Sequence, residues 1–150
     1  MMNWKWSRFA ALTVDDVYDM LGLRSRIFVV EQECVYLDID GVDRQSWHLL
    51  GRDGAGVLQA YLRVVDPGAR YELPSIGRVT VDSTQRGTGL GHALLAEGLR
   101  RCDEAWPGRA NHISAQARLR GFYGGHGYVP VGEEYLEDGI PHIGMERAPR

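Results

Sequence analysis

Apolar residues recur at spacings of three and four after Thr13, which predicts an amphipathic helix near the N-terminus. The members of this apolar stripe are Val17, Met20, Leu21, Ile27 and Phe28. Thr13 is suited to cap the helix, and Asp15 and Asp16 favour its first turn through the helix dipole. Arg24 falls inside the stripe, so either its stem is buried with its head in water or its charge points inward at an anionic ligand.

An acidic segment, ECVYLDIDGVDRQS, follows the helix and carries Asp38, Asp40 and Asp43. Its spacing differs from that of an EF-hand calcium loop, and no glutamate stands at the closing position. We expect a solvated loop here, and no metal site.

The rest of the chain alternates between strand and helix patterns. Strands are expected at 47–52, 57–65, 75–81, 112–117, 128–132 and 141–147, and helices at 92–106 and 118–127. DGAG, between the first two of these strands, suits a hairpin connection. The order predicts an α/β or α+β fold in which one mixed sheet carries helices, in a single domain that spans residues 1–150.

Composition narrows the class of protein. The chain has 150 residues, a formal net charge of −3 and 44% hydrophobic residues, as expected of a globular domain. No basic face points to nucleic acid, and no apolar run reaches the roughly 18 residues of a membrane span. The N-terminus shows no signal peptide. Cys34 and Cys102 are therefore expected to be free thiols in a cytoplasmic protein.

The segment QRGTGLG, residues 85–91, stands between a predicted strand and a predicted helix. Glycines at the start of a helix let its unpaired amides approach an anion such as a phosphate. The P-loop string G-x-x-x-x-G-K-[ST] is absent from the chain. Gly87, Gly89 and Gly91 are spaced G-x-G-x-G, which differs from the dinucleotide pattern G-x-G-x-x-G.

Arg86 to Gly91, RGTGLG, matches the pattern R/Q-x-x-G-x-G/A and resembles the acyl-CoA loop of the GNAT superfamily of N-acetyltransferases. Further along, FYGGHGY (122–128) is similar to the F-Y-x-x-x-G-F/Y segment of the same family. Over nearly the whole chain, segments such as LRSRIFVVEQECVYLDIDGVD and IGRVTV resemble the ElaA group of these acetyltransferases. That resemblance supplies no substrate.

The resemblance implies a splayed, mostly antiparallel sheet of about six or seven strands flanked by helices, with acetyl-CoA as co-substrate and no metal. The cofactor-binding residues that it implies are Val79, Thr80, Val81, Arg86, Gly87, Thr88, Gly89, Leu90, Gly91 and Phe122. The loop amides would hold the pyrophosphate, and the preceding strand would pair with the pantetheine arm. An amide of Val79 or Val81 would stabilise the thioester oxyanion.

Tyr123 occupies the position of the family's general acid, with packing of a short helix as the alternative. Its phenol would protonate the departing thiolate, because the ordinary pKa values of the two groups are close. His142, in PHIGM, resembles the base of relatives that act on small amino acid-like substrates, and it has a structural or surface role as its alternative. Glu31, Glu33 and Glu134 are alternative bases.

The same comparison assigns Arg24, Arg78 and Arg118 to an anionic substrate group, with surface salt bridges as the alternative. A covalent role for Cys34 is disfavoured, because the family commonly transfers the acetyl group directly.

Together these features predict direct acetyl transfer, through a tetrahedral intermediate, from acetyl-CoA to a primary amine of a small substrate that can carry a carboxylate. The rivals are an acyl-CoA-binding module without catalysis and an acetyltransferase of protein N-termini or lysines. The expected partner is a small molecule rather than nucleic acid or membrane, and the family favours a homodimer.

Overall fold

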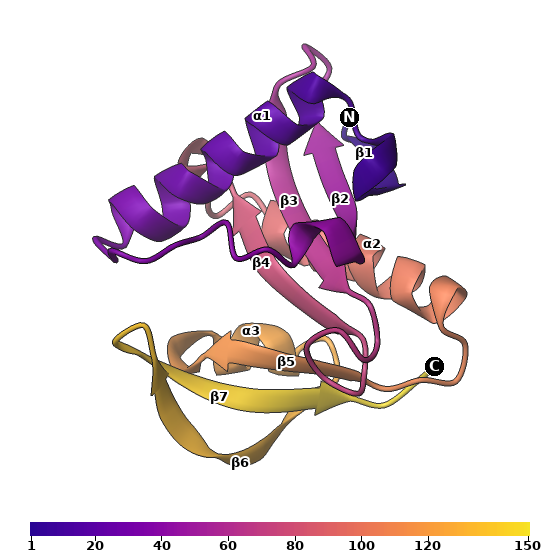
Figure 1. The fold of residues 1–150 in the computed structure, drawn as a ribbon, viewed down its shortest axis with the longest axis vertical. Coiled ribbons are helices and arrows are strands. Elements are labelled where there is room, and N and C mark those ends of the chain that lie inside the picture. The colour runs from indigo at the N-terminus through magenta and orange to yellow at the C-terminus, as the bar shows by residue number, and fades with distance from the viewer.

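Two antiparallel sheets with strand orders β1-β2-β3-β4 and β5-β7-β6 form the framework of the protein (Figure 1). The computed structural model describes all residues from 1 to 150. The first sheet contains β1 (Asn3–Arg8), β2 (Ser46–Arg52), β3 (Leu58–Val65) and β4 (Ser75–Val81). The second contains β5 (Asn111–Gln116), β6 (Tyr128–Glu137) and β7 (Ile140–Arg147).

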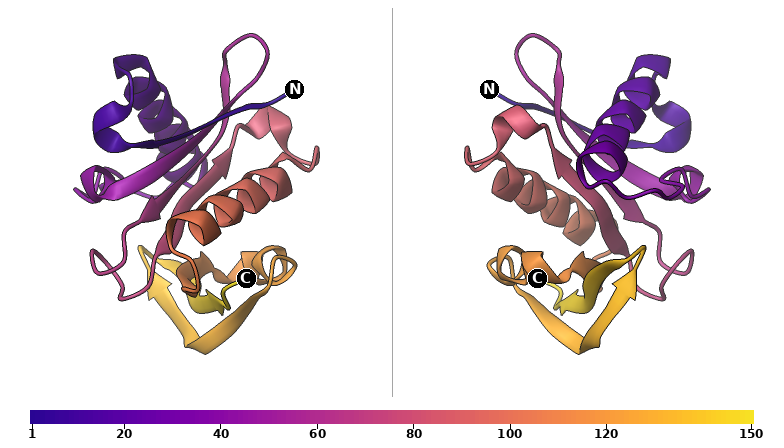
Figure 2. Two further views of the ribbon diagram at one scale, coloured as in Figure 1. Left: turned by 90° about the vertical axis from the view of Figure 1, so that its right-hand side faces the viewer. Right: turned by 90° about the vertical axis from the view of Figure 1, so that its left-hand side faces the viewer.

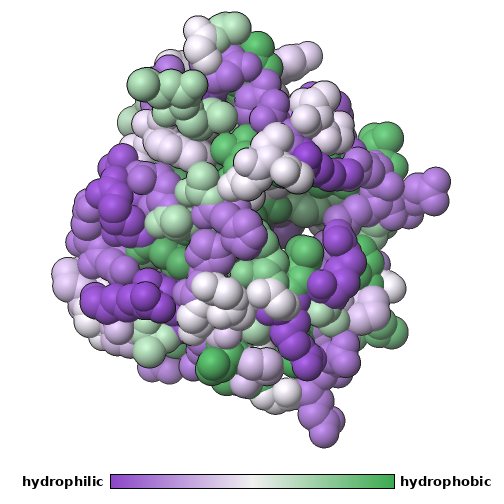
Figure 3. Space-filling model, turned by 180° about the vertical axis from the view of Figure 1, so that it is seen from behind, coloured by the Kyte–Doolittle hydropathy of each residue, from purple (hydrophilic) through white to green (hydrophobic).

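Helices cover both faces of the first sheet, with α1 on one side and α2 on the other (Figure 2). The helices are α1 (Val14–Arg24), which continues as a π-helix over Ser25–Glu31, α2 (Leu90–Ala105) and α3 (Arg120–Gly124). None of them is long and apolar enough to cross a membrane. Seen from behind, the surface is a mosaic of hydrophilic and hydrophobic residues (Figure 3).

The N-terminal helix forms for the predicted reason. The Thr13 hydroxyl accepts a hydrogen bond from the Asp16 amide at 3.0 Å, and the Asp16 carboxylate accepts one from the Thr13 amide at 3.1 Å. This reciprocal capping box satisfies two amides that the first turn leaves free. The buried side of the helix then packs Met20 and Leu23 against Tyr61 of β3.

The main core lies on the other face of the sheet, under α2. Leu49 belongs to this core whereas its neighbour Leu50 packs under α1, because successive strand residues point to opposite faces. Gly98 lets α2 approach β3 closely, since a Cβ built there would lie 2.7 Å from Leu62 Cδ2. Packing in the main core therefore holds α2 close against the first sheet.

The two sheets separate between β4 and β5 (Figure 1). These strands form no ladder, although the His112 amide donates to the Pro74 carbonyl at 3.1 Å at one end. The α+β class and the splayed sheet are confirmed. The prediction of one continuous mixed sheet needs correction, because every ladder is antiparallel and the strands divide into two sheets.

Two further predictions differ from the structure. β1 was not expected, and it exists because Trp4 and Trp6 pack against the main core while the strand pairs with β2. β6 does not end at residue 132 but continues to Glu137, because Tyr135 and Glu137 pair across a tight turn with β7. The segment EYLE is therefore strand and not loop.

Candidate active site

An irregularity in β4 opens its backbone toward the space between the sheets. The register between β3 and β4 shifts between Tyr61 and Arg63, so that Arg78 and Val79 together oppose Leu62. Arg78 has a left-handed backbone with φ of 51°. A bulge of this kind leaves an extra residue outside the ladder and bends the strand. The backbone beside Val79 is thus available to a ligand that lies along β4.

The glycine loop between β4 and α2 has free amides. Gly87 and Gly89 have φ of 77° and 84°, which glycine adopts without strain. α2 begins after Gly89 without a side-chain cap, and the amides of Gly87, Gly89, Gly91 and His92 have no acceptor in the protein. A Cβ built at Gly87 or Gly89 would meet no atom within 4 Å. Free amides at the positive end of the helix dipole, with open space before them, fit a phosphate.

A groove of about 580 Å³ runs beside this loop, along β4 and α3. The predicted cofactor residues that line it are Val79, Thr80, Val81, Arg86, Gly87, Gly89, Gly91 and Phe122. Two others do not line it. Leu90 is buried in the main core, and the Thr88 hydroxyl donates to the Gln85 carbonyl at 2.6 Å. The groove extends from the glycine loop to Tyr123.

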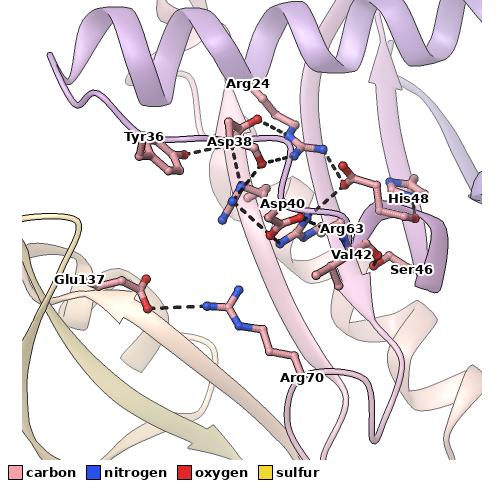
Figure 4. A network of polar contacts seen from close by, with 12 residues as sticks. Arg24, Tyr36, Asp38, Asp40, Val42, Ser46, His48, Arg63, Arg70 and Glu137 are labelled. Carbon is pink, nitrogen blue, oxygen red and sulfur yellow. Dashed lines mark hydrogen bonds and ion pairs between the residues drawn. The ribbon is translucent and has the colours of Figure 1, made fainter.

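A second hollow, of about 120 Å³, lies where the two sheets diverge, and it is the candidate acceptor cavity. The residues that line both hollows are Phe28, Gln32, Val79, Gln116, Leu119 and Tyr123. Two contacts tie the cavity walls together. Arg70 lies 3.6 Å from Glu137, as Figure 4 shows, and Cys34 Sγ lies 3.4 Å from the Asp138 carbonyl. The groove and the cavity meet at the six residues that line both, and these residues form the junction between the two hollows.

Tyr123 stands at this junction. Its side chain is almost fully buried between α3 and the main core, and its hydroxyl has no hydrogen-bond partner in the protein. Burial raises the pKa of the phenol well above its usual value, and the positive charge of Arg118 offsets only part of that effect. The hydroxyl is thus a proton donor throughout the neutral range and not a base.

His142 lies on the wall of the acceptor cavity at the start of β7, and it is 8% exposed. Its Nδ1–H donates to the Ile140 carbonyl at 2.7 Å, and its Nε2 lies 3.4 Å from Glu137 Oε2. The bond at Nδ1 fixes one tautomer, so Nε2 is the atom that can accept a proton. The sequence interpretation missed Glu137, which its position in the supposed loop had concealed.

The three alternative bases lie elsewhere. Glu31 lines the groove and pairs with Arg86 of the glycine loop. Glu33 and Glu134 line neither hollow and are exposed. Of the predicted bases, the structure brings only His142 to the acceptor cavity.

Arg24 is fully buried and does not line either hollow. Its Nε donates to Asp38 at 2.9 Å and its Nη1 to Asp43 at 2.7 Å, while Nη2 donates to the Asp38 carbonyl at 3.0 Å (Figure 4). The two interpretations of the sequence placed the Arg24 guanidinium either in water or facing a ligand, and in the structure neither holds. The guanidinium ties α1 to the acidic segment.

The prediction that the acidic segment is a solvated loop was wrong. Asp38 and Asp43 are buried, and Asp40 pairs with Arg63 Nη2 at 2.5 Å (Figure 4). Charges that leave water need partners, and three arginines, at positions 24, 63 and 78, supply them. Three carboxylates facing three guanidinium groups leave the cluster formally neutral. That this segment is not an EF-hand calcium loop remains a prediction from the spacing of its acidic residues.

The other two predicted substrate arginines differ from Arg24. Arg78 lines the acceptor cavity, where its Nε donates to Asp38 at 2.8 Å and its Nη1 has no partner in the protein. Arg118 is exposed on the wall of the groove, and its Nε donates to Gln116 at 3.2 Å. The structure therefore does not bring the three arginines to one point.

Both cysteines are free thiols. Cys34 is half-buried beside the acceptor cavity, and Cys102 is on the buried face of α2, where desolvation raises the pKa of its thiol to about 12. No group of three potential metal ligands comes together.

The fold is that of the acyl-CoA N-acyltransferase class, and the chain belongs to the GNAT family of acetyltransferases. The family model described as an acetyltransferase (GNAT) domain matches residues 30–148. Two solved structures are similar in fold and in sequence. An acyl-CoA N-acyltransferase from Pseudomonas aeruginosa has a TM-score of 0.93 and 43% identity, covering 99% of this chain and 100% of that chain. ElaA from Escherichia coli has a TM-score of 0.92 and 41% identity, covering 98% and 99%.

Sequence relatives agree over nearly the full length. ElaA of Escherichia coli K12 is 42% identical over 149 residues, 98% of this chain and 97% of the relative. A UPF0039 protein of Synechocystis is 44% identical over 144 residues, 96% of this chain and 94% of the relative.

Proposed function

We propose that the protein transfers the acetyl group of acetyl-CoA directly to a primary amine of a small molecule. The observation that carries this proposal is the junction at Tyr123, where a groove with free loop amides meets a second hollow between the two sheets. A binding module needs the groove, but it needs neither the second cavity nor an unpartnered acid between the two.

The groove supplies the co-substrate site. The free amides of the glycine loop would hold the pyrophosphate, and the bulged backbone of Val79, Thr80 and Val81 would lie along the pantetheine arm. This placement would set the thioester beside the amide of Val79 or Val81, which would stabilise the oxyanion of the tetrahedral intermediate.

The junction would supply the proton transfers. His142 Nε2 would take the proton of the attacking amine, since its Nδ1 is held by Ile140. Tyr123 would donate its proton to the departing thiolate. Burial keeps the phenol protonated at neutral pH, and because the raised pKa also makes it a weaker acid, the proton would move only once a thiolate has formed beside it.

The acceptor cavity favours a small substrate over a protein chain. Its walls are tied across by Arg70–Glu137 and by Cys34–Asp138, and its volume is about 120 Å³. A carboxylate on the substrate would find Arg78 Nη1, whereas Arg24 is out of reach. We therefore keep the carboxylate as an optional group that one arginine, and not three, would recognise.

Thiol release from acetyl-CoA, measured with a panel of small primary amines and with matched amino acids, tests the proposal. Mass spectrometry of the acceptor should show addition of one acetyl group. Tight binding of CoA without turnover of any amine would favour the binding module instead. Turnover of lysine peptides in preference to every small amine would favour the protein acetyltransferase.

A further inference from the structure

Two histidines that the proposed reaction does not use lie beside the glycine loop. His92 stands in the first turn of α2, and His126 follows α3. His92 Nδ1 and His126 Nε2 are 2.9 Å apart, which is a hydrogen bond with a single proton between the rings. Their ring centroids are 5.2 Å apart, and Phe122 packs beside both.

The free nitrogen of this pair belongs to the groove. His92 lines the groove, and its Nε2 has no partner in the protein. Its backbone amide is one of the four that have no acceptor. The His92 ring packs against Phe122 and lines the same groove as Gly87, Gly89 and Gly91. Helical side chains lean toward the N-terminus of their helix, so we expect the ring on the loop side of α2. An anion held by the amides would therefore be next to the imidazole.

The surroundings decide which ring carries the added proton. Burial lowers the pKa of His126, and the positive charges of His92 and Arg147 lower it further. Arg147, from β7, pairs with Asp103 of α2 and remains close to His126. His126 is thus the neutral partner, which accepts at Nε2 and directs the Nδ1 proton of His92 toward itself.

The remaining charges around the groove are few. Glu31, at the end of the π-helix, pairs with Arg86 of the glycine loop, and Arg118 lies after β5. Arg150 reaches Gly127, next to His126, from the C-terminus. No carboxylate contacts the histidine pair, so an arriving phosphate would be its nearest negative charge.

We propose that His92, oriented by His126, is a ligand of the CoA pyrophosphate and that binding takes up a proton at His92. This inference rests on the proposed function, because it requires CoA in the groove. The pyrophosphate adds negative charge next to an imidazole, and an opposite charge at this range stabilises the protonated ring. Binding is consequently stronger below the pKa of the free ring and loses this contribution as the pH rises through the pKa of the bound ring.

Dephospho-CoA is the probe that separates this effect from titration of the ligand. It retains the pyrophosphate but lacks the 3′-phosphate, a phosphate monoester with a second pKa of about 6. The dissociation constant is measured calorimetrically between about pH 6 and pH 8, the range in which imidazoles titrate. Comparison of two buffers with different ionisation enthalpies gives the number of protons taken up.

Wild-type protein should bind dephospho-CoA up to about tenfold more tightly at the acid end, which corresponds to a rise of about one unit in pKa. His92→Asn should remove this dependence and the proton uptake. His126→Asn should reduce both, and His112→Asn, which changes a histidine paired with Glu146 outside the groove, should leave both unchanged.

Three results would overturn the inference. The first is an equal pH dependence in wild type and His92→Asn. The second is a pH dependence with CoA that is absent with dephospho-CoA, which would trace the effect to the 3′-phosphate and not to a histidine at the pyrophosphate. The third is a uniform loss of affinity in His92→Asn at every pH, which would indicate stacking only. Absence of binding at every pH would instead refute the proposed function.

Discussion

At the scale of single residues, the candidate chemistry depends on side chains that are buried but not saturated with hydrogen bonds. Tyr123 has an unpartnered hydroxyl at the junction, and His142 has one nitrogen bonded to the Ile140 carbonyl and the other 3.4 Å from Glu137 on the cavity wall. Arg24 is the opposite case, since its Nε, Nη1 and Nη2 each donate a hydrogen bond to an acceptor within the protein. Burial alone therefore does not separate a reactive group from a structural one, whereas the pairing of its polar atoms does.

Tyr123→Phe should lower kcat about a hundredfold or more, because it removes a general acid. The dissociation constant of CoA should change little, since the hydroxyl bonds to nothing in the protein. Thiol release and calorimetry check the two quantities. Tyr128→Phe is the matched control, because the Tyr128 hydroxyl donates to Asn111 away from both hollows. Equal kcat in Tyr123→Phe and wild type would remove Tyr123 as the acid.

At the scale of elements, α2 serves the site at its beginning and the core along its length. Its first turn is bare of side-chain caps, and its buried residues pack on β3 and β4. The unit of β4, the glycine loop and α2 therefore combines a helix that is packed in the core with a first turn whose amides remain free.

Gly89→Ala should weaken CoA binding by at least about tenfold, or about 1.4 kcal/mol, because the new Cβ enters the space that the phosphate would occupy. Gly56→Ala is the control. Gly56, in the β2–β3 hairpin, has φ of 83°, close to the 84° of Gly89, and nothing surrounds its Cβ position either. Both variants should lose similar stability in urea unfolding, but only Gly89→Ala should lose affinity. Equal affinities would mean that the loop does not contact the ligand.

Gly98→Ala should destabilise the protein by about 1 kcal/mol or more, because the new methyl group overlaps Leu62 in a filled core. Gly22→Ala, in the last turn of α1, should instead stabilise by about 0.5–1 kcal/mol through helix propensity, because a Cβ there would meet only Arg26 Nη1 at 3.5 Å. Urea unfolding midpoints measure both changes. A stabilising Gly98→Ala would show that α2 and β3 can separate without loss.

At the scale of the whole molecule, buried charges connect the N-terminal helix, the acidic segment and the first sheet. Arg24 comes from α1, Arg63 from β3 and Arg78 from β4, and all three bind the segment that carries Asp38, Asp40 and Asp43. Neutrality of the cluster depends on ionised carboxylates, so the stability of the fold should depend on pH.

The free energy of unfolding should fall as the pH drops below about 4, the ordinary range for aspartate. Burial opposes ionisation of Asp40 and Asp43, but hydrogen bonds from Arg63 and Arg24 outweigh it and hold the pKa of each carboxyl below its usual value. A group with a lowered pKa in the folded state stabilises above its unfolded pKa and loses this contribution as the pH falls. Urea unfolding at several pH values should show a smaller acid loss in Asp43→Asn than in the surface variant Asp15→Asn.

Arg24→Met should cost about 3–5 kcal/mol, because it leaves buried carboxylates unpaired. The double variant Arg24→Met with Asp43→Asn should recover part of that loss. Thermal and urea unfolding of the four proteins of this cycle give the coupling. An additive result would mean that the two groups do not interact.

Features that depend on neighbouring residues could be predicted from the sequence alone. The Thr13 cap, the hairpin at DGAG and the loop RGTGLG are all local, and each formed as predicted. The apolar stripe formed as predicted in α1, whereas its last members, Ile27 and Phe28, lie in the π-helix that follows. The family followed from the same strings, since RGTGLG and FYGGHGY carry a resemblance that the family match bears out.

Which charges are free and which side chains meet could be learned only from the folded structure. Arg24, Arg78 and Arg118 looked alike in the sequence, yet one is enclosed by carboxylates, one keeps an open nitrogen in the cavity and one lies on the groove. Glu137 and the pair His92–His126 gave no local signal, because their partners lie 5 and 34 positions away. Ion pairing and desolvation depend on distance in space, and spacing along the chain does not encode that distance for residues brought together by folding.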